Sequence, residues 1–135
     1  MTTHSNIDKL AWIRLENGRV LCARSRGQDA FYLPGGKRER GETDEEALRR
    51  EVEEELSVAL KPETIAPYGT FQAQAHGKPE GVMVVMSCYT ADYDGELRPA
   101  AEIEELAWLT YADRERLSLV GKMIFDELRG KNLLH

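Results

Sequence analysis

The sequence has no long hydrophobic run and no basic tract. None of its apolar stretches reaches the roughly 20 residues that a membrane-spanning helix needs, and the polar segment Met1 to Lys9 lacks the basic and apolar regions of a secretory signal. Lysine and arginine number 18 against 24 acidic residues, so the net charge is −6. These features favour a cytoplasmic protein and disfavour binding to membranes or to nucleic-acid polymers.

Cysteine is also scarce, and two common nucleotide-binding motifs are missing. Cys22 and Cys88 lie in apolar, strand-like segments without the paired spacing of a zinc site, so we expect two buried, reduced thiols. Gly35-Gly36-Lys37 lacks the spacing of a phosphate-binding P-loop, and no Gly-x-Gly-x-x-Gly fingerprint occurs. A kinase or a dinucleotide-dependent dehydrogenase is therefore not expected.

A chain of 135 residues, 41% of them hydrophobic, suits one domain with a core, so a single domain over residues 1–135 is expected. Strand-like apolar spacing predicts six strands, at residues 7–15, 20–23, 31–33, 65–75, 82–89 and 103–109. Asn17-Gly18 favours a type I′ hairpin turn between the first two. Pro34-Gly35-Gly36 predicts a loop, and residues 76–79 a further turn in which His76 faces solvent.

Two helices are predicted. Thr43 and Glu46 have the spacing of a capping box, which places a helix from Asp44 to Leu56. A second helix should end at Gly130, because its apolar residues share one face: Leu117, Val120, Ile124 and Leu128. The order of strands and helices indicates an α/β protein with a mixed sheet and packed helices.

The first predicted helix carries an unusual set of carboxylates. With about 3.6 residues per turn, Glu51, Glu54 and Glu55 share one face. They border an apolar stripe made of Leu48, Val52 and Leu56. Crowded carboxylates repel one another, and oxygen-rich clusters of this kind suit hard divalent cations such as Mg²⁺ or Mn²⁺. The alternative is a solvated helix in which Arg50 pairs with Glu46 and with Glu54 at i,i+4 spacing.

The loop before this helix, taken with the helix itself, resembles the signature of the Nudix hydrolases, Gly-x5-Glu-x7-Arg-Glu-U-x-Glu-Glu-x-Gly-U, where U is a bulky aliphatic residue. Eight of the nine specified positions match: Gly36, Glu42, Arg50, Glu51, Val52, Glu54, Glu55 and Val58. Ser57 departs from the pattern, since it replaces a glycine that favours a left-handed backbone conformation.

This resemblance implies a Nudix-type α/β/α sandwich and a metal-dependent hydrolase that uses Mg²⁺ or Mn²⁺. By matching position, the metal ligands would be Glu51, Glu54 and Glu55 with the carbonyl of Gly35, while Arg50 would orient the carboxylates and Glu42 would shape the loop. The family often adds an acid before a late strand, for which Glu102 is the first candidate and Glu105 the second. A plain surface role is the alternative for both.

The implied reaction is attack of an activated water on one phosphorus of a pyrophosphate linkage, with a box glutamate or Glu102 taking the proton. Gly36 and Lys37 of the loop are candidate substrate contacts. Arg24 and Arg26 are candidate phosphate ligands, with solvent exposure as the alternative. Four aromatic residues are candidates for stacking on the base, with packing in the core as the alternative: Trp12, Phe31, Tyr68 and Phe71.

The expected substrate is a nucleoside diphosphate linked to a further group X. Residues 73–76 contain neither the proline nor the tyrosine that marks some Nudix subfamilies, and this absence favours nucleoside triphosphates or related small nucleotides. The competing hypothesis is a Nudix-like module that binds a nucleotide without cutting it. Family resemblance alone favours a homodimer.

Overall fold

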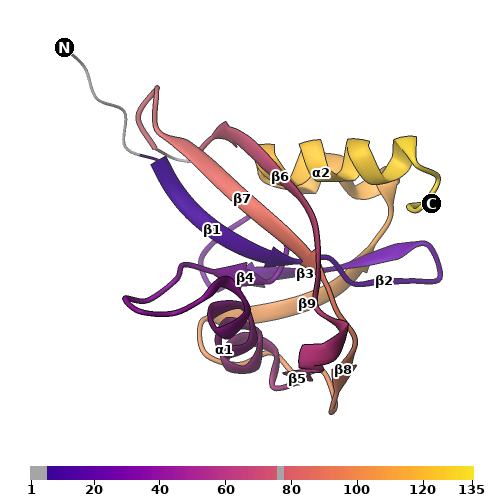
Figure 1. The fold of residues 1–135 in the computed structure, drawn as a ribbon. Coiled ribbons are helices and arrows are strands. Elements are labelled where there is room, and N and C mark those ends of the chain that lie inside the picture. Colours follow the sequence, from indigo (N-terminus) through magenta and orange to yellow (C-terminus); the bar gives the residue numbers. More distant parts are fainter. Residues whose placement is uncertain (1–5, 76–77) are drawn as a thin grey trace.

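The computed structural model describes residues 6–75 and 78–135, which form two α-helices and three sheets (Figure 1). The largest sheet has the order β4-β1-β7-β6, with β4 (Gly35–Gly36), β1 (Asn6–Trp12), β7 (Met83–Thr90) and β6 (Ala66–Gln74). The second sheet has the order β2-β3-β9, with β2 (Leu15–Glu16), β3 (Arg19–Ser25) and β9 (Ile103–Leu109). β1 and β7 are parallel, and the other pairs are antiparallel, so the predicted mixed sheet is confirmed.

The two α-helices lie on opposite sides of the strands, α1 (Asp44–Leu56) on one and α2 (Leu119–Gly130) on the other (Figure 1). Successive residues near the end of β1 point to opposite faces. Leu10 and Trp12 join a core cluster with the apolar stripe of α1, and Ala11 and Ile13 join a second cluster with the apolar face of α2. The arrangement is the expected α/β/α sandwich, with a core in each of its two interlayer spaces.

The type I′ turn at Asn17-Gly18 is confirmed, since both residues have positive φ, 53° and 74°. The prediction of one strand over residues 7–15 is wrong. β1 ends at Trp12 in the first sheet, beside β7, and β2 begins at Leu15 in the second sheet, where it pairs with β3. Alternating apolar residues reveal extended chain but do not show where it passes from one sheet to another.

Two further expectations around the glycine loop need correction. Gly35 and Gly36 form a short strand opposite Ala11 and Leu10 instead of a loop. Residues 31–33 form isolated bridges and no strand, because Tyr32 pairs with Ala23 while Phe31 pairs with Leu117. Prolines and glycines indicate a break in regular structure, but here both glycines pair with β1 and the chain between β3 and β4 is the irregular segment.

The remaining elements agree closely with the sequence. α1 and β9 have their predicted bounds, β6 and β7 differ by one residue at each end, and α2 ends at Gly130 as expected. Ser118 caps α2, which therefore starts after Leu117. Four short elements were not predicted: β5 (Ala59–Leu60), β8 (Tyr93–Asp94) and the 3₁₀ helices η1 (Pro62–Thr64) and η2 (Tyr111–Arg116). The expected turn at His76 lies partly outside the described residues.

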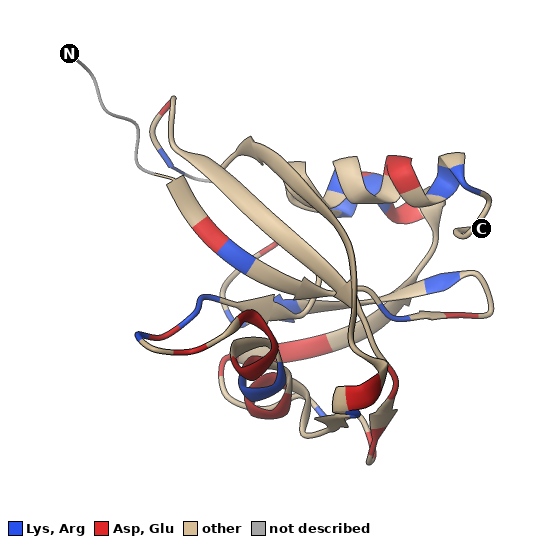
Figure 2. Cartoon of the chain, in the orientation of Figure 1, with Lys and Arg blue, Asp and Glu red and all other residues tan. Residues whose placement is uncertain are grey.

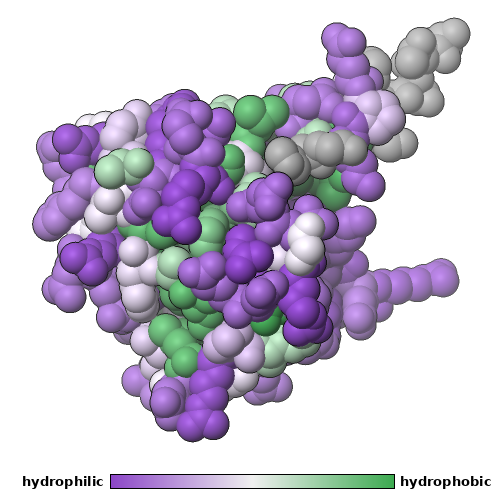
Figure 3. All heavy atoms as spheres, turned by 180° about the vertical axis from the view of Figure 1, so that it is seen from behind, coloured by the Kyte–Doolittle hydropathy of each residue, from purple (hydrophilic) through white to green (hydrophobic). Residues whose placement is uncertain are grey.

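Hydrophobic side chains are mainly inside the layers. Seen from behind, the surface is largely hydrophilic, with separate hydrophobic patches (Figure 3). The most exposed large apolar side chains belong to α2 and the segment after it: Leu119, Met123 and Leu133. Cys22 and Cys88 are buried and unpaired, as predicted. In the described part of the chain neither helix is long and apolar enough to cross a membrane. The homodimer stays a prediction.

Candidate active site

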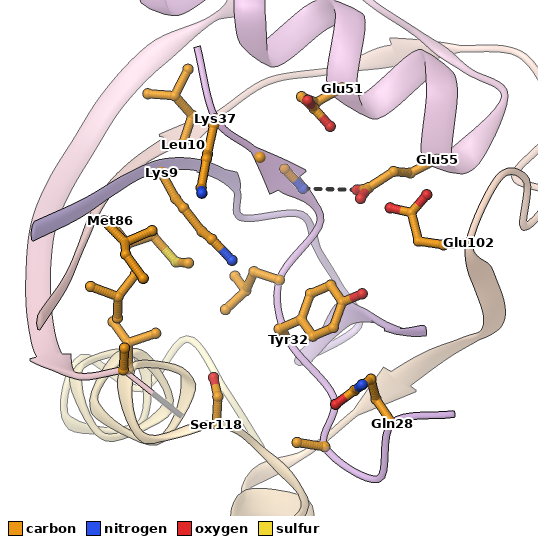
Figure 4. A pocket seen from close by; sticks show the side chains of 18 of the residues that line it. Lys9, Leu10, Gln28, Tyr32, Lys37, Glu51, Glu55, Met86, Glu102 and Ser118 are labelled. Atoms are coloured by element: carbon orange, nitrogen blue, oxygen red, sulfur yellow. Dashed lines mark hydrogen bonds between the residues drawn. The ribbon is translucent and has the colours of Figure 1, made fainter. Parts of the chain in front are cut away.

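A pocket of about 410 Å³ opens where α1, β4 and the large sheet meet (Figure 4). One end, here called the acidic half, is formed by Glu51 and Glu55 of α1 and by Glu102, which directly precedes β9. The other end, the apolar half, consists of side chains from β1, β7, α2 and the segment before β4: Ile7, Lys9, Leu33, Val84, Met86 and Val120. The pocket thus joins a cluster of carboxylates to an apolar chamber.

The start of α1 is fixed by the predicted capping box. The backbone N–H of Glu46 donates to Thr43 Oγ1 at 3.2 Å, and the N–H of Thr43 donates to the Glu46 carboxylate at 2.9 Å. Asp44 and Glu45 also lie in the first turn, where the helix dipole favours negative charge. The capping role of Glu46 explains why it does not pair with Arg50, as the solvated-helix alternative requires.

Arg50 organises the carboxylates around α1. Its Nε and Nη2 donate to both oxygens of Glu42 at 2.7 and 2.8 Å, and its Nη1 donates to Glu51 at 2.9 Å and to Glu54 at 3.5 Å. Nη2 also donates to the carbonyl of Lys37 at 3.1 Å. The guanidinium lowers the pKa of Glu42 to about 2. One arginine therefore ties the loop to the helix, and charges of both signs gather here (Figure 2).

Glu55 is the only buried charged residue in the described chain, with 4% of its surface exposed. Its carboxylate accepts a hydrogen bond from the N–H of Gly35 at 3.1 Å (Figure 4). Burial, and then the nearby carboxylates of Glu102 and Glu51, raise the pKa of Glu55 to about 8. Burial also raises the pKa of Glu51, although Arg50 opposes this. Three acidic side chains thus share a confined space in which their charges repel.

The two glycines of β4 create the room that this arrangement needs. Gly35 has a φ of +150°, and a side chain there would collide with the backbone carbonyl of Leu10. A side chain at Gly36 would collide with the Glu51 carboxyl group. Glycine therefore allows β4 to lie between β1 and the acidic face of α1.

The donor set of the acidic half fits a hard divalent cation, because all its side-chain donors are carboxylate oxygens and Arg50 pairs with Glu51 alone among them. Across residues 6–75 and 78–135, the ion pairs include none with Glu55 or Glu102. In the same residues no three acidic, histidine or cysteine side chains already surround one point. Glu51 and Glu54 instead turn toward Arg50.

Ser57 takes the conformation that the missing glycine would provide. It ends α1 with φ 66° and ψ 20°, in the left-handed region, and its N–H donates to the carbonyl of Glu53 at 3.0 Å. Its hydroxyl donates to the carbonyl of Arg98 at 3.3 Å. The turn after the helix is therefore kept with serine in this position.

Several predicted substrate contacts lie elsewhere. Arg24 contacts Glu105 at 3.2 Å, directly across the β3–β9 pair, and Arg26 donates to the carbonyl of Ala101 at 2.9 Å. Neither arginine lines the pocket, and neither does Glu105, whereas Glu102 does. Gly36 and Lys37 also line it. A role for these residues in substrate binding stays a prediction.

The four aromatic residues weighed for base stacking also lie outside the pocket. Trp12 and Phe31 are buried in the core, and Tyr68 and Phe71 pack against it. The sequence interpretation instead missed Tyr32, whose ring borders the pocket and whose hydroxyl contacts Ser25. It also missed Lys9 of β1. The sequence did contain a signal for it: Lys9 is two residues from both Ile7 and Ala11, so in a strand it lies on the same inward face as these apolar residues.

The NUDIX domain model matches residues 8–123. The chain therefore belongs to the Nudix hydrolase family, and the predicted fold, family and class of enzyme are confirmed at that level. It is 33% identical over 112 residues to the nucleoside triphosphatase NudI of Enterobacter sp. (strain 638), covering 74% of this chain and 78% of that protein. It is also 50% identical over 56 residues to the 8-oxo-dGTP diphosphatase of Haemophilus influenzae, covering 38% of this chain and 41% of that one.

Solved structures show the same fold at lower identity. The MutT NUDIX hydrolase from Burkholderia pseudomallei superposes with a TM-score of 0.77 at 23% identity, covering 93% of this chain and 99% of that chain. The E. coli ORF135 protein gives a TM-score of 0.73 at 23% identity, with coverage of 95% and 94%. The similarity spans almost the whole chain.

Proposed function

We propose that this protein hydrolyses a phosphoanhydride bond in a nucleoside diphosphate linked to X, with a nucleoside triphosphate or related small nucleotide as substrate. The observation that carries the proposal is the acidic half of the pocket, where Glu55 is buried beside Glu51 and Glu102. Such a cluster costs free energy unless a cation neutralises it. A divalent cation would also bridge an acidic protein of net charge −6 and an anionic nucleotide.

Mg²⁺ or Mn²⁺ fits the donor set, with Glu51, Glu54 and Glu55 and the Gly35 carbonyl as the residues that would hold it. When bound, such a cation polarises the phosphoryl group and lowers the pKa of nearby water. Arg50 keeps Glu51 and Glu54 on one side of α1 through its hydrogen bonds to both. Glu102 or one of the box glutamates accepts the proton from the attacking water.

The nucleoside triphosphate preference is supported by the apolar half and by one relative. A nucleobase is flat and largely apolar on its faces, so it suits a chamber lined by Val84, Met86 and Val120. The relative that this chain matches over 78% of its length is named a nucleoside triphosphatase. The negative charge of the chain and the size of the pocket favour a free nucleotide over a nucleic-acid polymer.

A release assay for phosphate and pyrophosphate tests the proposal. It compares nucleoside triphosphates, ADP-ribose, dinucleoside polyphosphates and nucleotide sugars, with Mg²⁺, with Mn²⁺ and with chelator. The variants are Glu54→Gln and, as a matched control, Glu53→Gln: both glutamates are exposed and lie outside the pocket lining, but Glu54 accepts a hydrogen bond from Arg50. We expect metal-dependent turnover that Glu54→Gln lowers about 100-fold and Glu53→Gln leaves intact. Nucleotide binding without turnover on any substrate would favour the noncatalytic module.

A further inference from the structure

Lys9 is the charged residue of the apolar half. It stands opposite Met86 in the parallel β1–β7 register, next to the pair formed by Ile7 and Val84. All four of these residues line the pocket. In Figure 4 the Lys9 side chain extends from β1 into the pocket, between Met86 and Tyr32 and away from Glu51. An ammonium group is therefore held within a chamber whose walls are mostly apolar.

Lys9 has no partner that would explain its position structurally. In residues 6–75 and 78–135 its ammonium takes part in none of the ion pairs or side-chain hydrogen bonds. Lys37 and Lys78 also border the pocket but are exposed, whereas Lys9 is half-buried. Burial, followed by the charge of Lys37, lowers the pKa of Lys9, and the carboxylates of Glu55 and Glu51 oppose this without forming an ion pair with it. The ammonium of Lys9 is therefore partly removed from solvent and has no hydrogen-bond acceptor from the described protein, so its N–H groups are available to a ligand in the pocket.

The position of Lys9 indicates which part of a nucleotide that acceptor belongs to. This step rests on the proposed function, in which the scissile phosphates lie at the acidic half. The base then occupies the apolar half, where its faces contact Met86 and Val84 and its edge meets Lys9. Lysine has three N–H donors and no acceptor, so it can only favour base edges that present acceptors.

We infer that Lys9 selects the base of the substrate, favouring the keto bases guanine, uracil and thymine over the amino bases adenine and cytosine. Guanine presents O6 and N7, and uracil and thymine present O4, as acceptors. Adenine and cytosine place an amino donor at the corresponding exocyclic position, which would face the Lys9 ammonium donor to donor, and adenine keeps only N7 as an acceptor on this edge. The preference arises from matching hydrogen-bonding groups in a site where water is scarce.

The test measures kcat/KM for GTP, UTP, ATP and CTP, which share one triphosphate and differ in the base. Lys9→Met keeps the length of the aliphatic chain and removes the ammonium, and Lys61→Met serves as a control on a half-buried lysine that pairs with Asp94 outside the pocket. The wild type and Lys61→Met should favour GTP and UTP about tenfold or more over ATP and CTP. Lys9→Met should abolish that ratio, and its thermal unfolding should show an intact fold.

Other outcomes overturn the inference. Equal kcat/KM for the four nucleotides in the wild type would do so, and so would a ratio that Lys9→Met leaves unchanged. A loss by one common factor on all four would place Lys9 at a phosphate instead of the base.

Binding separates this inference from the proposed function. If the wild type cleaves no nucleotide, the proposed function fails, and dissociation constants for GDP, UDP, ADP and CDP decide the role of Lys9. A keto preference that Lys9→Met removes would still support base selection. Equal affinities, or no binding at all, would overturn it.

Discussion

The acidic and apolar halves of the pocket are built from the chain in different ways. Glu51 and Glu55 come from one helix and lie within a continuous motif, whereas Lys9 and Met86 come from strands 77 residues apart in sequence. The acidic half is held by hydrogen bonds to Arg50 and by the backbone of β4. The apolar half is held by the register of β1 against β7. The proposals above assign chemistry to the acidic half and choice of base to the apolar half.

The largest effect should come from breaking the acidic half at its buried member. Glu55→Gln keeps the shape and the hydrogen bond from Gly35 but removes the charge, so kcat should fall on the order of 100- to 1,000-fold. The keto-to-amino preference should stay unchanged in the residual activity. Steady-state kinetics on the best substrate would check both points, and near-normal turnover would show that Glu55 is a structural residue.

The pH dependence of stability in the metal-free protein should also distinguish the acidic half, because Glu55 is buried there. Glu55 has a pKa of about 8 in the folded state and an ordinary value of 4.5. Between these values the folded state binds more protons than the unfolded state, so the free energy of unfolding falls as pH rises from about 4.5 to about 8. Glu55→Gln lacks this loss, which should amount to roughly 2–4 kcal/mol.

Urea unfolding in chelator, at pH 5 and at pH 8.5, would test this dependence. The variant should gain stability relative to the wild type at the higher pH. A difference between the two proteins that is the same at both pH values would contradict the buried, proton-holding state of Glu55.

Arg50 links the acidic half to its loop, and its geometry should matter more than its charge. Arg50→Lys keeps the positive charge but loses the planar fork that contacts Glu42 through two hydrogen bonds while also reaching Glu51. Activity should fall roughly 10- to 100-fold, as for other residues that orient metal ligands. Arg49→Lys, on the neighbouring residue of α1, is the control. Equal activity of both variants would show that charge alone suffices.

The smallest effect is expected at Ser57, which lies outside both halves. Glycine adopts its left-handed conformation without the steric cost that serine incurs, so Ser57→Gly should stabilise the protein by about 0.5–1 kcal/mol. The lost hydroxyl bond to Arg98 opposes part of this gain. Denaturant unfolding would measure the change, with Ser57→Ala as a variant that loses the hydroxyl without gaining conformational freedom. Destabilisation by glycine would contradict the account.

The acidic half was predictable because its signals are local. The capping box at Thr43 and Glu46 defined the start of α1, and helical spacing placed Glu51 and Glu55 on one face. Glu102 was found only through the family pattern, and the structure places it at the pocket. The contact of Arg50 with Glu54 is the i,i+4 pair that helical spacing offered, whereas the burial of Glu55 could not be read from spacing alone.

The apolar half was not predictable, because it depends on which strands pair. The pattern at Ile7 and Lys9 showed that a lysine points inward, but only the β1–β7 register brings it to Met86. Arg24 illustrates the same limit, since its partner Glu105 is 81 residues away on β9. Both cases depend on long-range pairing, which single-strand periodicity does not encode.

Equilibrium binding of Mn²⁺ to the metal-free protein tests the central claim most directly. Titrations at pH 8.5 would compare the wild type with Glu55→Gln and with Glu53→Gln, the exposed neighbour outside the pocket. The account predicts saturable binding to the wild type and to Glu53→Gln, and an affinity at least about tenfold weaker for Glu55→Gln. Equal affinity in all three proteins, or no binding to the wild type, would show that the acidic half does not hold a cation.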